Sequence, residues 1–173
     1  MPIINAYLLE ESCMGGMNNC VAVGLSPEHL AHIFPFHFCL NRDLVPVQVG
    51  RSLQRLVPAL MNGKPITHFL SVEHPKSIVD FDSILAHLDE LFVMWFAHPD
   101  LRLRGQMVHL AEQEKVLFLG SPWMTEMATL QKLGLTRADF SLIDPAVDLL
   151  GVLEAQESAL SDVMLFAREL TRQ

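Results

Sequence analysis

Two arginines, Arg102 and Arg104, are the first residues whose spacing suggests binding chemistry. They alternate with Leu101 and Leu103, so on an extended strand both guanidinium groups point to one face and both leucines to the other. Such a pair can hold an anion. Charges that alternate with leucines more commonly form the solvated face of a half-buried strand. The pair therefore predicts one wall of a folded module rather than a catalytic site.

Histidines and cysteines are the next candidates for chemistry. His29 and His32 lie three residues apart on a predicted helix, with Cys39 nearby in the sequence. Metal ligation needs further ligands of defined geometry, and no Cys-x-x-Cys pair accompanies them, so a coincidental pair on a helix surface is the favoured interpretation. Cys13 and Cys20 have six residues between them, a spacing that matches no standard redox motif. We therefore predict no metal site and no redox pair.

Four aromatic residues are candidates for the lining of a ligand cavity. They are Phe36, Phe38, Trp95 and Trp123. A packed aromatic core is the commoner outcome for residues of this kind, and both interpretations stay open at this point.

The overall composition bounds the class of protein. A chain of 173 residues, half of them apolar, fits one domain with a real core. Its formal charge of −8 argues against nucleic acid and anionic membranes as partners. The longest apolar run, Leu91–Ala97, is far below the ~20 residues that span a bilayer. Because the N-terminus lacks the basic residues of a signal peptide, we expect a cytoplasmic protein with reduced thiols.

The pattern of apolar residues predicts a mixture of helices and strands. Ser26, followed by Pro27, has the N-cap and first-turn residues of a helix. The alternation over 34–49 predicts a hairpin, in which Pro46 should face an open edge because it cannot donate to a ladder. Gly105 predicts a bulge, because the apolar residues are at odd positions before it (Leu101, Leu103) and at even positions after it (Val108, Leu110). Further predicted elements are helices at 51–63, 80–96 and about 124–133, strands at 101–110 and 115–123, and a capping box at 136–139.

The C-terminal segment differs in kind from the rest. Asp144 and Pro145 predict the cap and first turn of a helix that runs to the terminus. Its apolar residues are spaced alternately four and three apart, which is the seam of a coiled coil. The seam consists of Leu149, Leu153, Gln156, Leu160, Val163, Ala167 and Leu170. We therefore expect this helix to project from an α+β module and to pair with a second copy as a homodimer.

Several of these segments also carry a family resemblance. The stretches FPFHFCLNRDLVPVQVG, LRLRGQMVHL, VLFLGSPW and LGLTRADFSLIDPAVDLL occur in this order. Together they resemble the heme-NO-binding-associated (H-NOXA) domain of soluble guanylate cyclases and of bacterial histidine kinases and cyclases. The resemblance runs from about Ser26 to Arg172. It implies a PAS-like antiparallel sheet with flanking helices and a C-terminal coiled-coil signalling helix, divided into an arm (1–25), a PAS-like domain (26–143) and the helix (144–173).

His87 is the residue at which heme chemistry would enter. Heme-binding PAS domains place a proximal histidine on a helix like the one predicted at 80–96, but a boundary histidine satisfied by water or backbone is the default interpretation. The heme-binding partner domain of the family carries a Tyr-x-Ser-x-Arg motif. The single tyrosine here, Tyr7, is followed by Leu-Leu-Glu-Glu. We therefore expect no heme, no metal and no other cofactor.

The resemblance leaves three functions open. The first is a regulatory dimerisation and relay module that couples an upstream nitric-oxide-type heme sensor to a cyclase or kinase output domain, in cis or in trans. The second is a small-molecule or heme sensor in its own right, and the third is a free-standing interaction protein that regulates a cyclase or kinase. Because no Gly-rich phosphate loop is present, we assign no catalytic residue and expect any output domain beyond Gln173.

Overall fold

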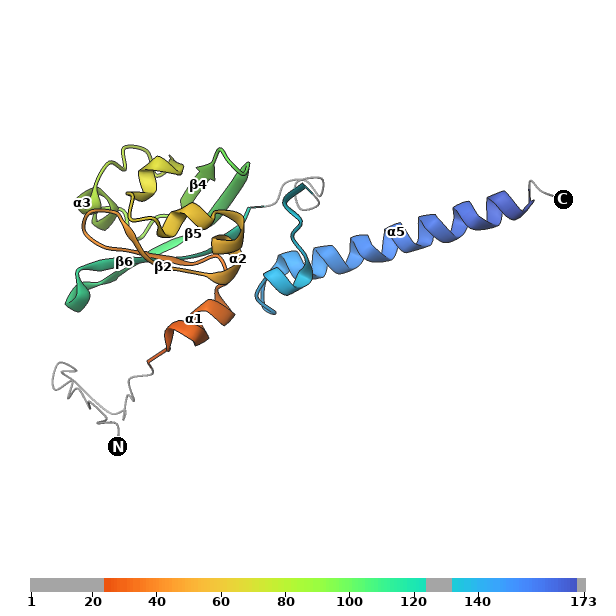
Figure 1. Ribbon diagram of the computed structural model, residues 1–173, viewed down its shortest axis with the longest axis horizontal. Coiled ribbons are helices and arrows are strands. Elements are labelled where there is room, and N and C mark those ends of the chain that lie inside the picture. Colours follow the sequence, from red (N-terminus) through yellow and green to blue (C-terminus); the bar gives the residue numbers. More distant parts are fainter. Residues whose placement is uncertain (1–23, 124–131, 171–173) are drawn as a thin grey trace, which may run out of the picture.

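The computed structural model describes residues 24–123 and 132–170, which form an antiparallel sheet of six strands with several short helices (Figure 1). The strand order is β2-β1-β6-β5-β4-β3. The strands are β1 (Phe38–Leu40), β2 (Pro46–Val49), β3 (Leu70–His74), β4 (Phe92–Phe96), β5 (Leu101–Leu110) and β6 (Lys115–Pro122). The helices are α1 (Pro27–Ile33), α2 (Arg51–Leu56), α3 (Phe81–Leu85), α5 (Pro145–Leu170) and the 3-10 turns η1 (Pro58–Met61), η2 (Ile66–His68), η3 (Ala111–Gln113) and η4 (Arg137–Asp139). The fold class is therefore α+β.

The N-terminal part of the sheet follows the sequence prediction. Ser26 caps α1 by accepting a hydrogen bond from the backbone N–H of His29 at 3.2 Å. β1 and β2 form the predicted hairpin, and Pro46 lies on β2, an edge strand of the sheet, where proline is tolerated. The helix predicted at 51–63 is divided, because Val57 precedes Pro58 and leaves the helical region.

The helix predicted over 80–96 is wrong for most of its length. Asp80 caps α3 through a reciprocal capping box with Ser83, but α3 ends at Leu85. Residues Phe92–Phe96 instead form β4, which pairs with β3 on one side and β5 on the other. Four of its five residues are buried, so the strand shows no alternation and its apolar residues coincide with helical spacing.

The bulge predicted at Gly105 is also wrong. β5 and β6 pair without a register shift from Leu103–Pro122 to Leu110–Lys115, and Gly105 lies directly opposite Gly120. The buried phase continues through Gly105 to Met107. Glycine is required here for another reason, since a β-carbon at Gly105 would collide with the carbonyl oxygen of Leu119 and lie 2.5 Å from the Cα of Gly120. The two glycines therefore allow a close approach of the two longest strands.

The core lies on one face of the sheet, which we call the inner face. Phe38, Phe118 and Met107 are in register across β1, β6 and β5, and the Phe38 and Phe118 rings stack at 4.8 Å between centroids. The buried core also includes residues of the short helices that cover this face: Leu53, Leu60, Ile66, Phe81 and Ile84. Because side chains alternate along a strand, Arg104, Gln106, Leu119 and Ser121 lie on the opposite, outer face.

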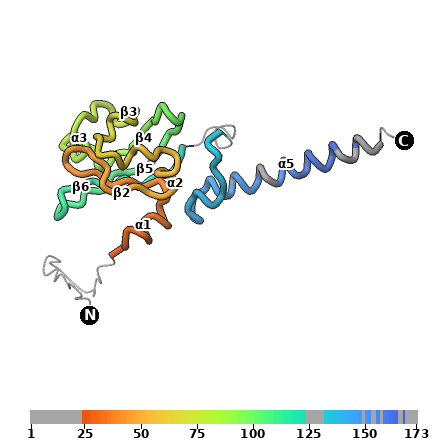
Figure 2. Tube along the Cα trace, viewed as in Figure 1, coloured from red at the N-terminus to blue at the C-terminus, as the bar shows by residue number. Residues whose placement is uncertain are grey.

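The helix α5 begins beside the sheet and then leaves it. Figures 1 and 2 show it as one long rod that extends away from the sheet, with its C-terminal end farthest from the other elements. At 26 residues it is about 39 Å long. The capping box predicted before it is confirmed between Thr136 and Asp139. No helix in the described ranges is both long and apolar enough to cross a membrane.

Candidate functional site

The two arginines of β5 have different surroundings. Arg102 lies 3.1 Å from a Glu73 carboxylate oxygen and 5.8 Å from the centre of the Trp95 ring. The indole N–H of Trp95 in turn donates to Asp100 at 2.8 Å. Arg104 has no such partners among the described residues. The structure therefore does not bring the two guanidinium groups together as an anion clamp, because Arg102 is already engaged.

The histidine and cysteine candidates differ in their exposure to solvent. His29 and His32 are exposed on α1, whereas Cys39 is buried in β1. Burial raises the pKa of the Cys39 thiol, although the charge of Lys115 acts in the opposite direction. Within residues 24–123 and 132–170, no group of three or more metal-ligating side chains is close enough to hold an ion. Cys13 and Cys20 lie outside the described residues, as do most of the predicted helix at 124–133 and nearly all of the arm.

His87 lies beyond the end of α3 rather than within a helix. Its Nδ1 is 2.7 Å from the Ser83 carbonyl oxygen, and its Nε2 is 4.0 Å from a Glu90 carboxylate oxygen. A second histidine, His74, approaches the same carboxylate at 3.5 Å. Both ring nitrogens of His87 thus face protein groups, and His87 does not line either of the two hollows described below.

The four aromatic candidates do not lie together. Phe36 and Phe38 are buried, whereas Trp95 is half-buried and Trp123 is exposed. Phe38 lines a cavity of about 260 Å³ on the inner face, whose lining is apolar except for Thr67 and Ser71. Phe36 packs against Phe140 at 5.5 Å between ring centroids and lines a different hollow. The structure therefore does not assemble the four aromatic residues into one pocket.

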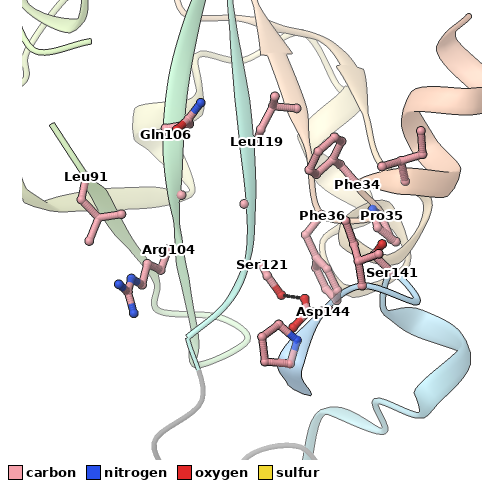
Figure 3. Close-up of a pocket in the computed structure, with 15 residues that line it drawn as sticks. Phe34, Pro35, Phe36, Leu91, Arg104, Gln106, Leu119, Ser121, Ser141 and Asp144 are labelled. Carbon is pink, nitrogen blue, oxygen red and sulfur yellow. Dashed lines mark hydrogen bonds between the residues drawn. The ribbon is translucent and has the colours of Figure 1, made fainter. Parts of the chain in front are cut away.

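That second hollow is a groove of about 480 Å³ on the outer face, and sequence reasoning missed it (Figure 3). Its floor is the middle of β5 and β6. Its walls are the end of α1 on one side and the residues before α5 on the other. The lining residues are Ile33, Phe34, Pro35, Phe36, Leu91, Arg104, Gly105, Gln106, Leu119, Gly120, Ser121, Ser141, Ile143, Asp144 and Pro145. No sequence signal marks it, because its walls come from three segments far apart in the chain.

The groove contains the joint between the sheet and α5. The Ser121 hydroxyl donates to the Asp144 carboxylate, as the dashed line in Figure 3 marks. The other Asp144 oxygen accepts the backbone N–H of Ala146 at 2.9 Å. Asp144 therefore acts as the N-cap predicted from the sequence and also fastens the start of α5 to β6.

The sequence matches the family described as heme NO binding associated over residues 23–100 and 94–173, which together cover most of the chain. The chain belongs to the heme NO binding associated family.

Guanylate cyclases are among the proteins to which this heme NO binding associated domain is similar. Guanylate cyclase soluble subunit alpha-1 of Rattus norvegicus is 30% identical over 151 residues, which cover 81% of this chain and 20% of the relative. Head-specific guanylate cyclase of Drosophila melanogaster is 28% identical over 149 residues (79% and 22%). Guanylate cyclase soluble subunit beta-2 of Rattus norvegicus is 26% identical over 128 residues (68% and 19%). The chain spans about a fifth of the length of these relatives.

In this heme NO binding associated domain, the seam residues of α5 whose side chains the structure describes are exposed. Val147 and Leu150, in the first two turns of the helix, are buried and belong to the hydrophobic core. Farther along, Leu160 is 61% exposed and Val163 is 63% exposed. Gln156 and Ala167 are exposed as well, whereas the side chains of Leu149, Leu153 and Leu170 lie outside the described part.

Proposed function

We propose that this heme NO binding associated domain is a PAS-like dimerisation and signal-relay module. It couples an upstream nitric-oxide-type sensor to the output domain of a nucleotide cyclase or histidine kinase. Two findings support this function: the family match, and relatives that are named as subunits of guanylate cyclases.

The single observation that carries the proposal is the contrast between the two ends of α5. Its first turns belong to the buried core and are held by the Ser121–Asp144 hydrogen bond. Farther along, four apolar side chains are more than half exposed: Val152, Leu160, Val163 and Met164. Val152 and Val163 are eleven residues apart and Leu160 and Met164 four apart, so they form one stripe along the helix. An apolar stripe of this length on an exposed helix is typical of an interaction surface.

Parallel pairing of two copies would bury the stripe and bring both C-terminal ends together, as two output domains require. Gln156 at a seam position costs stability but fixes the register by bonding its counterpart. A movement of the sheet would then be transmitted along a stiff helix pair.

The test is to place a charge in the seam. Leu160→Lys should give a monomer or a far weaker dimer, because two like charges would face each other across a dry interface. Ser158→Lys, on the opposite side of the helix, is the matched control and should stay dimeric. The measurement is light scattering behind a sizing column at micromolar concentration. If Leu160→Lys is as dimeric as the unmodified chain, α5 does not pair through this seam and the relay proposal fails.

A second candidate function is a small-molecule sensor in its own right, which the apolar inner cavity favours. An absorption spectrum of the purified protein tests its heme form, since bound heme would give a strong band. Retention of that band in His87→Ala would exclude His87 as the ligand.

A further inference from the structure

We infer that the outer-face groove binds a small amphipathic carboxylate, a molecule with one carboxylate and an apolar body. This site goes beyond the proposed relay function and is separate from the seam of α5. Its volume of about 480 Å³ lies within the range of small-molecule sites.

The apolar wall of the groove specifies the body of the ligand. Phe34 at the end of α1, Leu119 on β6 and Ile143 before α5 line it from three directions. Ile143 is 77% exposed and Leu91, at the rim, is 42% exposed. A hydrocarbon body that covers these apolar side chains removes them from water, which favours binding.

The charges of the groove specify the head of the ligand. The lining contains one cation, Arg104, and one anion, Asp144. Both carboxylate oxygens of Asp144 already accept hydrogen bonds, from Ser121 and from the Ala146 N–H. The N-terminal end of α5 offsets the remaining charge of Asp144.

Arg104 remains the group that can bind a ligand. It is exposed, and it makes no ion pair or hydrogen bond through its side chain with any other described residue. Gln106, two positions along β5 and on the same face, likewise has an unengaged amide within that part of the chain. The Arg104 guanidinium is a suitable donor for a carboxylate, because hydrogen bonds to ionised groups are about twice as strong as neutral ones.

The position of the groove gives the ligand a means of acting on α5. Two residues that line the groove lie at the start of the helix: Ile143 is two residues before α5, and Pro145 is its first residue. On the sheet, Arg104 is the cross-strand partner of Ser121. In Figure 3, Arg104 lies on one side of the groove and the Ser121–Asp144 bond on the other. A ligand that contacts both sides adds a second link between the sheet and the root of α5.

The experiment uses the full chain and three probes of equal length: sodium octanoate, 1-octanol and octylamine. Calorimetry should show that octanoate binds at least about tenfold more tightly than octanol, and that octylamine does not bind, because only octanoate can pair with Arg104. In methyl NMR spectra, octanoate should shift the signals of Leu119 and Ile143. The signals of Ile84 and Met107, in the inner cavity, should stay unchanged.

Two variants of the same strand complete the test. Arg104→Gln is exposed and should fold normally while losing the preference for octanoate over octanol. Arg102→Gln removes an arginine of the same face that already has a partner, and should bind octanoate like the unmodified chain. Equal binding of octanoate and octanol, or an unchanged octanoate affinity in Arg104→Gln, would overturn the assignment. Binding of octanoate to the Leu160→Lys variant but not to the unmodified chain would overturn it as well. That result would mean that a second copy of the chain fills the groove in the dimer.

Discussion

The hydroxyl of Ser121 donates a hydrogen bond to the carboxylate of Asp144, and this contact fastens β6 to the first turn of α5. Asp144 also accepts from the Ala146 N–H, so one side chain both caps the helix and attaches it. The Asp144 carboxylate, together with the buried side chains of Val147 and Leu150, therefore holds the start of α5 in place.

Replacement of Asp144 by alanine should lower the free energy of unfolding by about 1 kcal/mol, the usual cost of a lost N-cap. Urea denaturation followed by circular dichroism measures this change, and hydrogen exchange should show faster exchange at Ala146 and Val147. Asp162→Ala, in the exposed middle of the same helix, is the control and should change stability much less. Equal effects of the two substitutions would show that Asp144 does not cap α5.

Gly105→Ala should destabilise the sheet by about 1–3 kcal/mol, because the added β-carbon would meet the backbone of Leu119 and Gly120 rather than a movable side chain. Gly105→Val should be worse. Gly24→Ala is the matched control, since a β-carbon there meets nothing within 4 Å. The measurement is the thermal midpoint, and an unchanged midpoint in Gly105→Ala would mean that the strands can separate locally at no cost.

Asp139 should make the fold sensitive to acid. Burial acts to raise the pKa of Asp139, but the backbone N–H of Thr136 and the guanidinium of Arg55 at 2.8 Å outweigh it and lower the pKa. The stabilisation is therefore present above the ordinary pKa of aspartate and is lost as the pH falls through the lowered pKa of the folded state.

Asp139→Asn should accordingly cost about 1 kcal/mol at pH 7, and this difference from the unmodified chain should vanish in strong acid. Asp82→Asn removes a carboxylate whose ion pair with Arg42 is exposed, so it should have little effect at any pH. Urea titrations at several pH values distinguish the two variants. A stability difference for Asp139→Asn that is independent of pH would contradict the assignment.

His37 should act in the same direction at a higher pH. Burial lowers the pKa of His37, although its hydrogen bond to the Phe34 carbonyl oxygen opposes this. The unfolded chain thus takes up a proton below about pH 6.5 while the folded chain stays neutral, so stability falls as the pH drops from there toward the lowered pKa. His37→Gln should reduce that slope, and the exposed His68→Gln should not. Identical slopes in both variants would rule His37 out.

Much of the local structure could be predicted from the sequence, because the determining contacts are local. The Ser26 cap, the Thr136–Asp139 capping box and the Asp144 cap each depend on residues within three positions. The alternation of Leu101 and Leu103 with two arginines likewise predicted a strand with one buried face. These patterns are read correctly since they require no knowledge of distant partners.

The errors arose where distant partners decide the structure. β4 lies between β3 and β5 in the sheet and four of its five residues are buried, so its apolar run carries no strand period. Its aromatic and β-branched residues, Phe92 and Val93 among them, were the available signal for a strand. β3 was not predicted at all. Gly105 was read as a bulge, but its requirement for glycine comes from Gly120 on the next strand. The groove was missed for the same reason.

The order of the strands has a consequence for how the chain folds during synthesis. β1 can pair with β2 as soon as both are synthesised, but its other edge pairs with β6. Phe38 therefore contacts Phe118 only after most of the domain has left the ribosome. A hairpin of two strands is marginal in water, so the nascent β1–β2 pair exposes an open strand edge and aromatic side chains during this interval. Such edges pair with other chains when they are left uncovered. The domain is therefore most exposed to aggregation before β6 is made, and ribosomes stalled ahead of residue 115 should yield a chaperone-dependent fragment rather than a smaller folded unit.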